Sequence, residues 1–188
     1  MSTRTATATI RATFESLIKN VLDASETGSP QISLGDKPSL QFATGTGANQ
    51  CDRMWAQKAR TVANGAAESL DIYDLGSVDI GAGAGNDGLG KSVVLAEICV
   101  LMIANASTSG GNLLIGGNGT GAAWNSIFAS QTSGEDDAIV VLKPGGVLIL
   151  AAPPDPAYAV ADSTNHILKL DSSAGTCTFD IVILGRSA

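Results

Sequence analysis

Aromatic and charged residues are scarce in this chain. Of its 188 residues, 4% are aromatic and 15% are charged, whereas 44% are apolar. A core must therefore be packed mainly with aliphatic side chains and alanine, and the length suffices for one domain with an attached arm. The formal net charge is −7, and the eleven basic residues are scattered. A nucleic-acid groove or an anionic membrane requires clustered Lys and Arg, so we expect neither as a partner.

Long apolar runs and metal-binding spacings are also missing. No run approaches the roughly 18 residues of a membrane span, and the first ten residues lack the apolar segment of a secretory signal. Cys51, Cys99 and Cys177 are far apart, without a close Cys–Cys or His–His pair. We therefore expect no metal site and no cofactor, and three buried or half-buried thiols.

Alternating patterns and turn residues predict a fold made of strands. Thr7 to Glu15 alternates polar and apolar residues, which indicates a half-buried strand. The spacing that follows, Leu17 to Leu22, fits a short helical turn, and 24–38 resembles a linker. Further strands are predicted at Leu40–Thr44, Met54–Val62, Ser69–Tyr73, His166–Leu170 and Cys177–Leu184, with a turn at Asn64-Gly65. Short strands separated by turns predict an all-β, jelly-roll-like antiparallel β-sandwich over 39–188, with residues 1–38 as an N-terminal strand and arm.

One segment is ambiguous. Val93 to Ala104 is apolar on both faces except at Glu97, which fits either a central strand or a buried helix. Its β-like neighbours and its first residues favour a strand.

The stretch from Asp137 to Ala152 carries the clearest local signal. Two β-branched, apolar runs, Ile139–Leu142 and Val147–Leu150, flank Lys143-Pro144-Gly145-Gly146. Proline followed by glycine suits a type II turn. We predict a β-hairpin that is buried on at least one face.

A glycine-rich loop, Gly81 to Ser92, matches several binding motifs at once. It fits the P-loop pattern ending in Lys91 and Ser92, a GxGxxG pattern, and nearly a calcium-binding nonapeptide. A P-loop requires a buried strand before it and a helix after it, whereas the preceding residues are polar and the following run favours a strand. An exposed connection between strands is the main interpretation. A nucleotide hydrolase using Lys91 and Ser92, with Asp155 after the apolar run Val147 to Ala152 as a Walker B aspartate, remains an alternative.

Residues typical of catalysis are few. His166, the single histidine, lies in an alternating strand, which favours a core or rim position over a general base. Glu135 to Asp137 fits a solvated turn better than an acid–base pair, and no GxSxG elbow is present. We therefore expect no enzymatic activity. Trp55 and Trp124 fit core or subunit-contact positions better than a sugar-binding site.

Six segments in a fixed order resemble a known family: GTGANQ from Gly45, AESLDIYDL from Ala67, a long apolar strand, KPGGVLILAAPP from Lys143, YAV from Tyr158 and TFDIVILGRS from Thr178. Together they resemble small virion structural proteins of tailed bacteriophages over about Leu40 to the C-terminus. The resemblance implies a jelly-roll module that binds the capsid as a cement or decoration protein, often as a trimer at a symmetry axis. It leaves residues 1–38 uncovered.

The resemblance implies a function in assembly. We expect a capsid-surface protein that stabilises the phage head between capsomers, assembled in the host cytoplasm, with itself and the major capsid protein as partners. An acidic surface suits a shell protein that must not adhere to packaged DNA. Candidate contacts are Trp55, Trp124 and the N-terminal residues Ile10 and Phe14. A tail or fibre module that recognises a host receptor is the alternative.

Overall fold

A computed structural model of the chain describes residues 8–11, 20–23, 26–28, 39–77, 93–116, 122–127 and 139–187. Fourteen strands and one short 3₁₀ helix, η1, lie in these ranges. The sandwich is formed by β6 (Arg53–Val62), β7 (Ala67–Asp71), β8 (Leu95–Asn105), β9 (Asn112–Gly116), β10 (Ile139–Leu142), β11 (Val147–Ala151), β12 (Tyr158–Ala159), β13 (Ile167–Ser173) and β14 (Cys177–Ser187). The others are β1 (Ala8–Arg11), β2 (Asn20–Asp23), β3 (Glu26–Gly28), β4 (Ser39–Thr44), β5 (Gln50–Cys51) and η1 (Leu75–Ser77).

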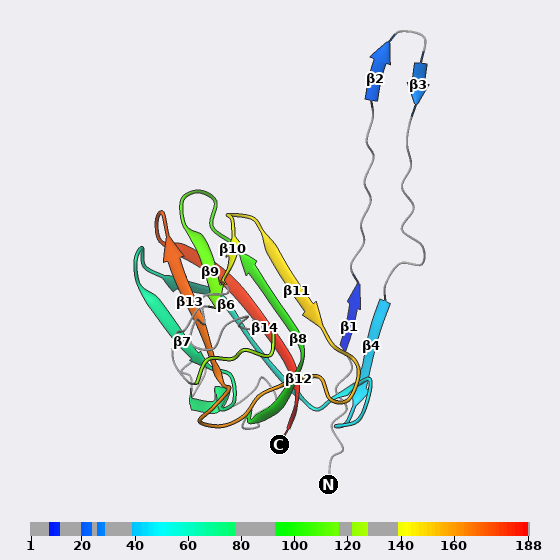
Figure 1. The fold of residues 1–188 in the computed structure, drawn as a ribbon, viewed down its shortest axis with the longest axis vertical. Helices are drawn as coiled ribbons and strands as arrows, with labels where there is room; N and C mark the ends of the chain where they lie inside the picture. Colours follow the sequence, from blue (N-terminus) through cyan, green and yellow to red (C-terminus); the bar gives the residue numbers. More distant parts are fainter. Residues whose placement is uncertain are drawn as a thin grey trace.

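Two antiparallel sheets face each other (Figure 1). Sheet I has the order β11-β8-β14-β6, and β12 extends its β11 side by pairing with β8. Sheet II has the order β10-β9-β13-β7. The predicted all-β antiparallel sandwich is confirmed, including the strand interpretation of the apolar run from Val93, which forms β8.

The main core lies between the sheets. Strand alternation turns Phe179, Ile181 and Ile183 of β14 inward, as the sequence predicted, against Leu168 and Leu170 of β13. All five side chains are almost completely buried. The core is aliphatic apart from a few aromatic rings, which agrees with the composition.

The predicted hairpin is wrong in its pairing, although both of its strands and its turn exist. β10 pairs with β9 in sheet II, whereas β11 pairs with β8 in sheet I. The turn between them has the expected geometry: the Gly146 N–H donates to the Lys143 carbonyl at 2.8 Å, and Gly145 has a φ of 76°. It is therefore a corner that joins the edges of the two sheets.

Asn105 explains why the chain crosses between sheets at this corner. Its backbone pairs with Gly145 and Gly146, and its buried side-chain Nδ2 donates to the carbonyls of Gly111 (3.0 Å) and Leu142 (2.9 Å). These bonds link the end of β8 to both strands that flank the turn. Since buried amides must be satisfied, this network specifies the corner rather than a hairpin ladder.

The N-terminal strands lie outside the sandwich. β1 pairs antiparallel with β4, and β4 pairs parallel with the two-residue β5. β2 and β3 pair with each other and stand away from the sheets in Figure 1. Val21 and Leu22 lie in β2, so the helical turn predicted there is wrong. The predicted boundary after residue 38 falls immediately before β4.

Candidate interaction surface

Sheet I is apolar on its outward side as well as in the core. The register aligns Ile149 of β11 with Met102 of β8, Met102 with Val182 of β14, and Val182 with Ala56 of β6. The next row, two residues along, joins Ala151, Val100, Leu184 and Met54 in the same way. The row on the other side joins Val147 to Ala104 and then reaches the charged Asp180 of β14, where the apolar face ends. We call these ten residues the outer face: Met54, Ala56, Val100, Met102, Ala104, Val147, Ile149, Ala151, Val182 and Leu184.

One end of the outer face is covered by the chain itself. Phe42 of β4 and Cys51 of β5 pack with Cys99, Val100 and Leu184 into a second hydrophobic cluster. All five side chains are buried. A register shift between Leu184 and Gly185 marks the β-bulge that disrupts the alternation of β8 here.

Arg186 fastens this covered end. Its side chain is 2% exposed and forms an ion pair with Glu97. The guanidinium also donates to the carbonyls of Gln50 (3.1 Å), Pro153 (3.2 Å) and Pro154 (2.9 Å). A buried charge is tolerated when every donor is engaged, so Arg186 ties β5 and the segment after β11 to the end of sheet I.

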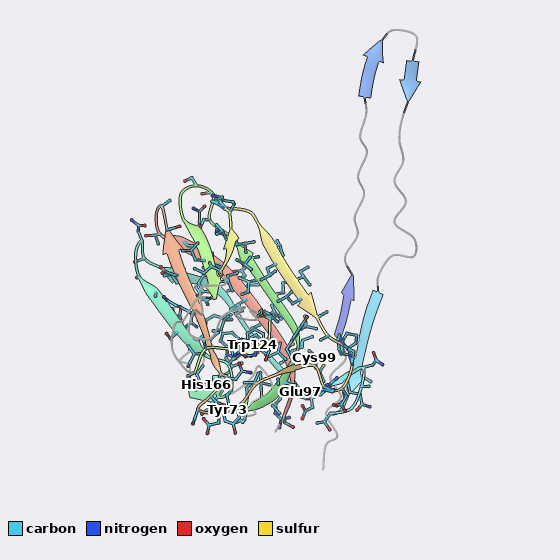
Figure 2. All side chains as sticks on the ribbon, viewed as in Figure 1. Tyr73, Glu97, Cys99, Trp124 and His166 are labelled. Carbon is cyan, nitrogen blue, oxygen red and sulfur yellow. The ribbon has the colours of Figure 1, made fainter. Side chains whose placement is uncertain are left out.

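The other end of the outer face remains exposed. Among the described residues, five large hydrophobic side chains are exposed: Met54, Ile139, Val141, Val147 and Ile149. Four of them lie on β10 and β11, the edge strands that the corner joins. In Figure 2 the side chains of β11 project from the free border of sheet I. Contiguous exposed apolar surface marks sites of protein–protein contact.

The three thiols do not add a reactive centre to this surface. Cys51, Cys99 and Cys177 are free and buried, as the sequence predicted. Burial raises the pKa of Cys99 to about 11, so its nucleophilic thiolate is scarce at neutral pH. Within the described ranges, no three His, Cys, Asp or Glu residues are grouped to hold a metal ion.

The tryptophans named from the sequence lie inside the sandwich. Trp55 is 1% exposed and Trp124 is 2% exposed, both in the main core. The Trp124 indole N–H donates to the Ala159 carbonyl at 2.9 Å, and its ring meets Tyr158 edge to face. Packing accounts for both residues, and their proposed subunit contacts stay a prediction.

The remaining candidates are placed as follows. Ile10 lies in β1, whereas Phe14, the loop 81–92 and the acidic run 135–137 lie outside the described residues. His166 precedes β13, half-buried, with its backbone bonded to Ala122 and Ile72. Of the two described candidates, His166 lies beside sheet II and Ile10 lies in a strand outside the sandwich.

The outer face could have been found from two sequence signals. β8 is apolar on both faces, which also describes a strand covered on one side by its own chain and on the other by a partner. Val147 and Ile149 alternate with Leu148 and Leu150, so both faces of β11 are apolar as well. We interpreted these patterns as burial within one domain.

No described helix is long and apolar enough to span a membrane. Comparison of the chain with protein-family models, with curated proteins and with solved structures finds no match.

Proposed function

We propose that this chain is a virion structural protein of a tailed bacteriophage, and that it stabilises the head as a cement or decoration protein bound between capsomers. The exposed part of the outer face carries this proposal, because an assembly protein acts by burying surface against its neighbours. The resemblance of the segments from Gly45 to Ser187 supplies the phage context. Its partners are then the major capsid protein and further copies of itself, with a trimer as the form that the resemblance implies.

The size of the outer face favours many weak contacts over one strong contact. With strands about 4.8 Å apart and same-face side chains about 7 Å apart, the ten residues of the outer face cover roughly 340 Å². A standard interface buries about 800 Å² per partner. Ile149 and Met54 are already more than half buried, so burial of their remaining exposed area stabilises a contact by about 1 kcal/mol each. On a symmetric shell, such contacts reinforce one another through effective concentration.

We also assign the sandwich to the jelly-roll type. The chain passes from sheet I to sheet II and back as it runs from β6 to β14, with β9 and β10 as consecutive members of sheet II. Two antiparallel four-stranded sheets wound in this interleaved way support two Greek keys. Shell proteins use this architecture, and it presents two broad sheet faces to neighbours.

The test is occupancy of purified particles by variants on opposite sides of the sandwich. Val182→Asn places a polar amide at the centre of the outer face, and we expect about tenfold weaker capsid binding, or about 1.4 kcal/mol. Leu114→Asn is the matched control, since Leu114 is half-buried on the outward side of sheet II. Equal occupancy of both variants would reject the outer face as the shell contact.

The arm has its own test. Deletion of residues 1–24 removes β1 and β2 and leaves the sandwich strands intact. We expect a folded protein with reduced shell occupancy, and unchanged occupancy would exclude a contact by the arm. Imaging of assembled particles distinguishes a head position from the alternative, a tail or fibre module, for which we expect density at the tail and binding to a host glycan or protein.

A further inference from the structure

The outer border of β11 is an unpaired sheet edge. β11 pairs with β8 along its whole length, from Val147 opposite Ala104 to Ala151 opposite Val100. Within the described part of the chain, no strand pairs with its other side. In Figure 1, β11 is the outermost strand of sheet I, and β1 and β4 stand beyond its C-terminal end.

The ladder defines which backbone groups this edge presents. The Asn105 N–H donates to the Gly146 carbonyl at 2.9 Å, and the Ala152 N–H donates to the Cys99 carbonyl at 2.8 Å. In an antiparallel ladder, bonded and non-bonded pairs alternate. Residues 148 and 150 therefore bond to β8, whereas residues 147, 149 and 151 direct their N–H and C=O groups away from the sheet.

This edge lacks the features that normally block strand addition. Val147 to Ala151 contains no charge, no proline and no bulge in its register with β8. The opposite edge of sheet I is protected. β6 has a register shift against β14, a positive φ of 54° at Ala59, and the basic residues Arg53, Lys58 and Arg60. Proteins use charges and bulges to prevent edge pairing, so their absence from β11, in contrast to β6 at the other edge of the same sheet, is informative.

We propose that β11 is a self-association edge, at which two copies of this chain pair antiparallel about a two-fold axis through Ile149. This register places Val147 opposite Ala151 of the second copy and Ile149 opposite itself. All three outward-directed residues of each strand then form bonded pairs, which gives about six hydrogen bonds. The exposed side chains of Val147 and Ile149 meet their counterparts on one face of the joined sheet.

Charge supports a second copy as the occupant. The chain carries a net charge of −7, yet β11 is uncharged, so two copies can meet here without like charges in contact. Lys143 precedes β11 and Asp155 follows it, and both side chains are exposed. Antiparallel pairing brings the basic end of one copy toward the acidic end of the other, which favours this orientation over a parallel one.

This inference rests on the proposed role in assembly, because it names the partner of the same apolar surface. A five-residue edge is small, so we expect a weak dimer that is strengthened when copies are held on a shell. If the chain forms trimers, as the resemblance implies, this two-fold contact would join one trimer to the next. It would be separate from the contacts that hold each trimer together.

The first experiment measures the association of purified chain by sedimentation, without capsids. Ile149→Lys places a charge at the two-fold axis, and we expect at least a tenfold weaker dimer, about 1.4 kcal/mol. Met54→Lys is the matched control: Met54 is 42% exposed and Ile149 43%, and both belong to the outer face, but Met54 lies on the β6 edge. Equal weakening by both variants would indicate face-to-face packing and overturn edge pairing, as would a monomeric wild type.

The second experiment uses the wild-type chain and does not depend on a variant folding. Residue-resolved hydrogen exchange should show the amides of Val147, Ile149 and Ala151 becoming protected as concentration rises. The amides of Leu148 and Leu150 should be protected at every concentration because they bond to β8. Rapid exchange at the three outward amides in a concentrated sample would overturn the proposal.

The two proposals fail separately. Loss of solution pairing with retained capsid occupancy would reject the β11 edge and leave the virion role. Retained pairing with no binding to particles would reject the virion role and leave the edge.

Engineered Ile149→Cys should form a disulfide-linked dimer on mild oxidation, whereas Met54→Cys should not.

Discussion

The outward sides of the two sheets differ in chemistry although they belong to one sandwich. Sheet II presents polar residues along its central strands: Lys169 and Asp171 on β13, opposite Ser69 on β7 and Leu114 on β9. Sheet I presents Met102 and Val182 at the corresponding centre. The polar side chains on sheet II can form hydrogen bonds with water. On sheet I, β4 and β5 of the same chain cover part of the apolar surface. The centre of sheet I is thus apolar where the centre of sheet II is polar, although the β10 edge of sheet II also exposes Ile139 and Val141.

The largest expected effect is at the covered end of sheet I. Arg186→Ala removes the charge that holds Gln50, Pro153 and Pro154, and it leaves Glu97 without its ion pair. Removal of one partner from a buried ion pair costs about 3–5 kcal/mol, and we expect a loss of this size in the free energy of unfolding by urea.

Arg53→Ala provides the control for Arg186. Arg53 forms an ion pair with the adjacent Asp52 at 2.7 Å, with both side chains about one fifth exposed. Partly exposed pairs contribute about 0–1 kcal/mol. If both variants lost the same stability, the bonds of Arg186 would not be what holds β5 and the segment after β11 against sheet I.

A cavity at the second cluster should have the next largest effect. Phe42→Ala removes the ring that β4 places over Val100 and Leu184. Substitutions of buried phenylalanine by alanine cost about 3–5 kcal/mol, and we expect the lower part of this range because the cluster is small. The variant should also expose new apolar surface, which binding of a hydrophobic dye would detect. A loss below about 1 kcal/mol would show that β4 does not complete sheet I.

The pH dependence of stability tests the same cluster. Burial raises the pKa of Cys99 to about 11, above its ordinary value of 9.0. A raised pKa of a thiol means that the folded state retains the proton longer than the unfolded state does. The contribution of Cys99 to the free energy of unfolding is therefore fully present below about pH 9, and it is lost as the pH rises toward 11.

The measurement is the difference in unfolding free energy between wild type and Cys99→Ala across this range. Groups that titrate there at a distance from Cys99 cancel in the difference. We expect the difference to shrink between about pH 9 and 11 and to stay constant from pH 6 to 8. A constant difference up to pH 11 would place Cys99 in a more hydrated site than the structure shows.

Sequence patterns predicted where the strands of this fold lie better than they predicted which strands pair with each other. Alternation identified β7, β13 and β14, and proline followed by glycine identified the corner turn. Local turn chemistry does not determine whether the flanking strands pair with each other. That choice depends on Asn105, which lies far from the turn in sequence and bonds to both sides of it. Asn105 and Leu142 are 37 residues apart, so a sequence pattern read over about ten residues cannot reveal the hydrogen bond between them.

The candidate surface was hidden by the same limitation. A strand that is apolar on both faces has two explanations, burial within its own domain or burial against a partner, and periodicity does not distinguish them. The structure decides for the strands of sheet I. Phe42 covers Val100 and Leu184, whereas no described residue covers Ile149 and Val147.

The smallest effect on stability should come from the exposed end of the outer face. Val147→Thr with Ile149→Thr keeps β-branched side chains on β11, so strand propensity is retained. Both residues are about half exposed, and we expect the free energy of unfolding to change by less than about 0.5 kcal/mol. Association, in contrast, should weaken, because the apolar area buried between copies falls. Thermal unfolding at low protein concentration, where the chain is monomeric, measures the stability of the single chain separately from its association. A loss of several kcal/mol under these conditions would mean that Val147 and Ile149 belong to the core of a single chain, and the contrast between the two ends of sheet I would disappear.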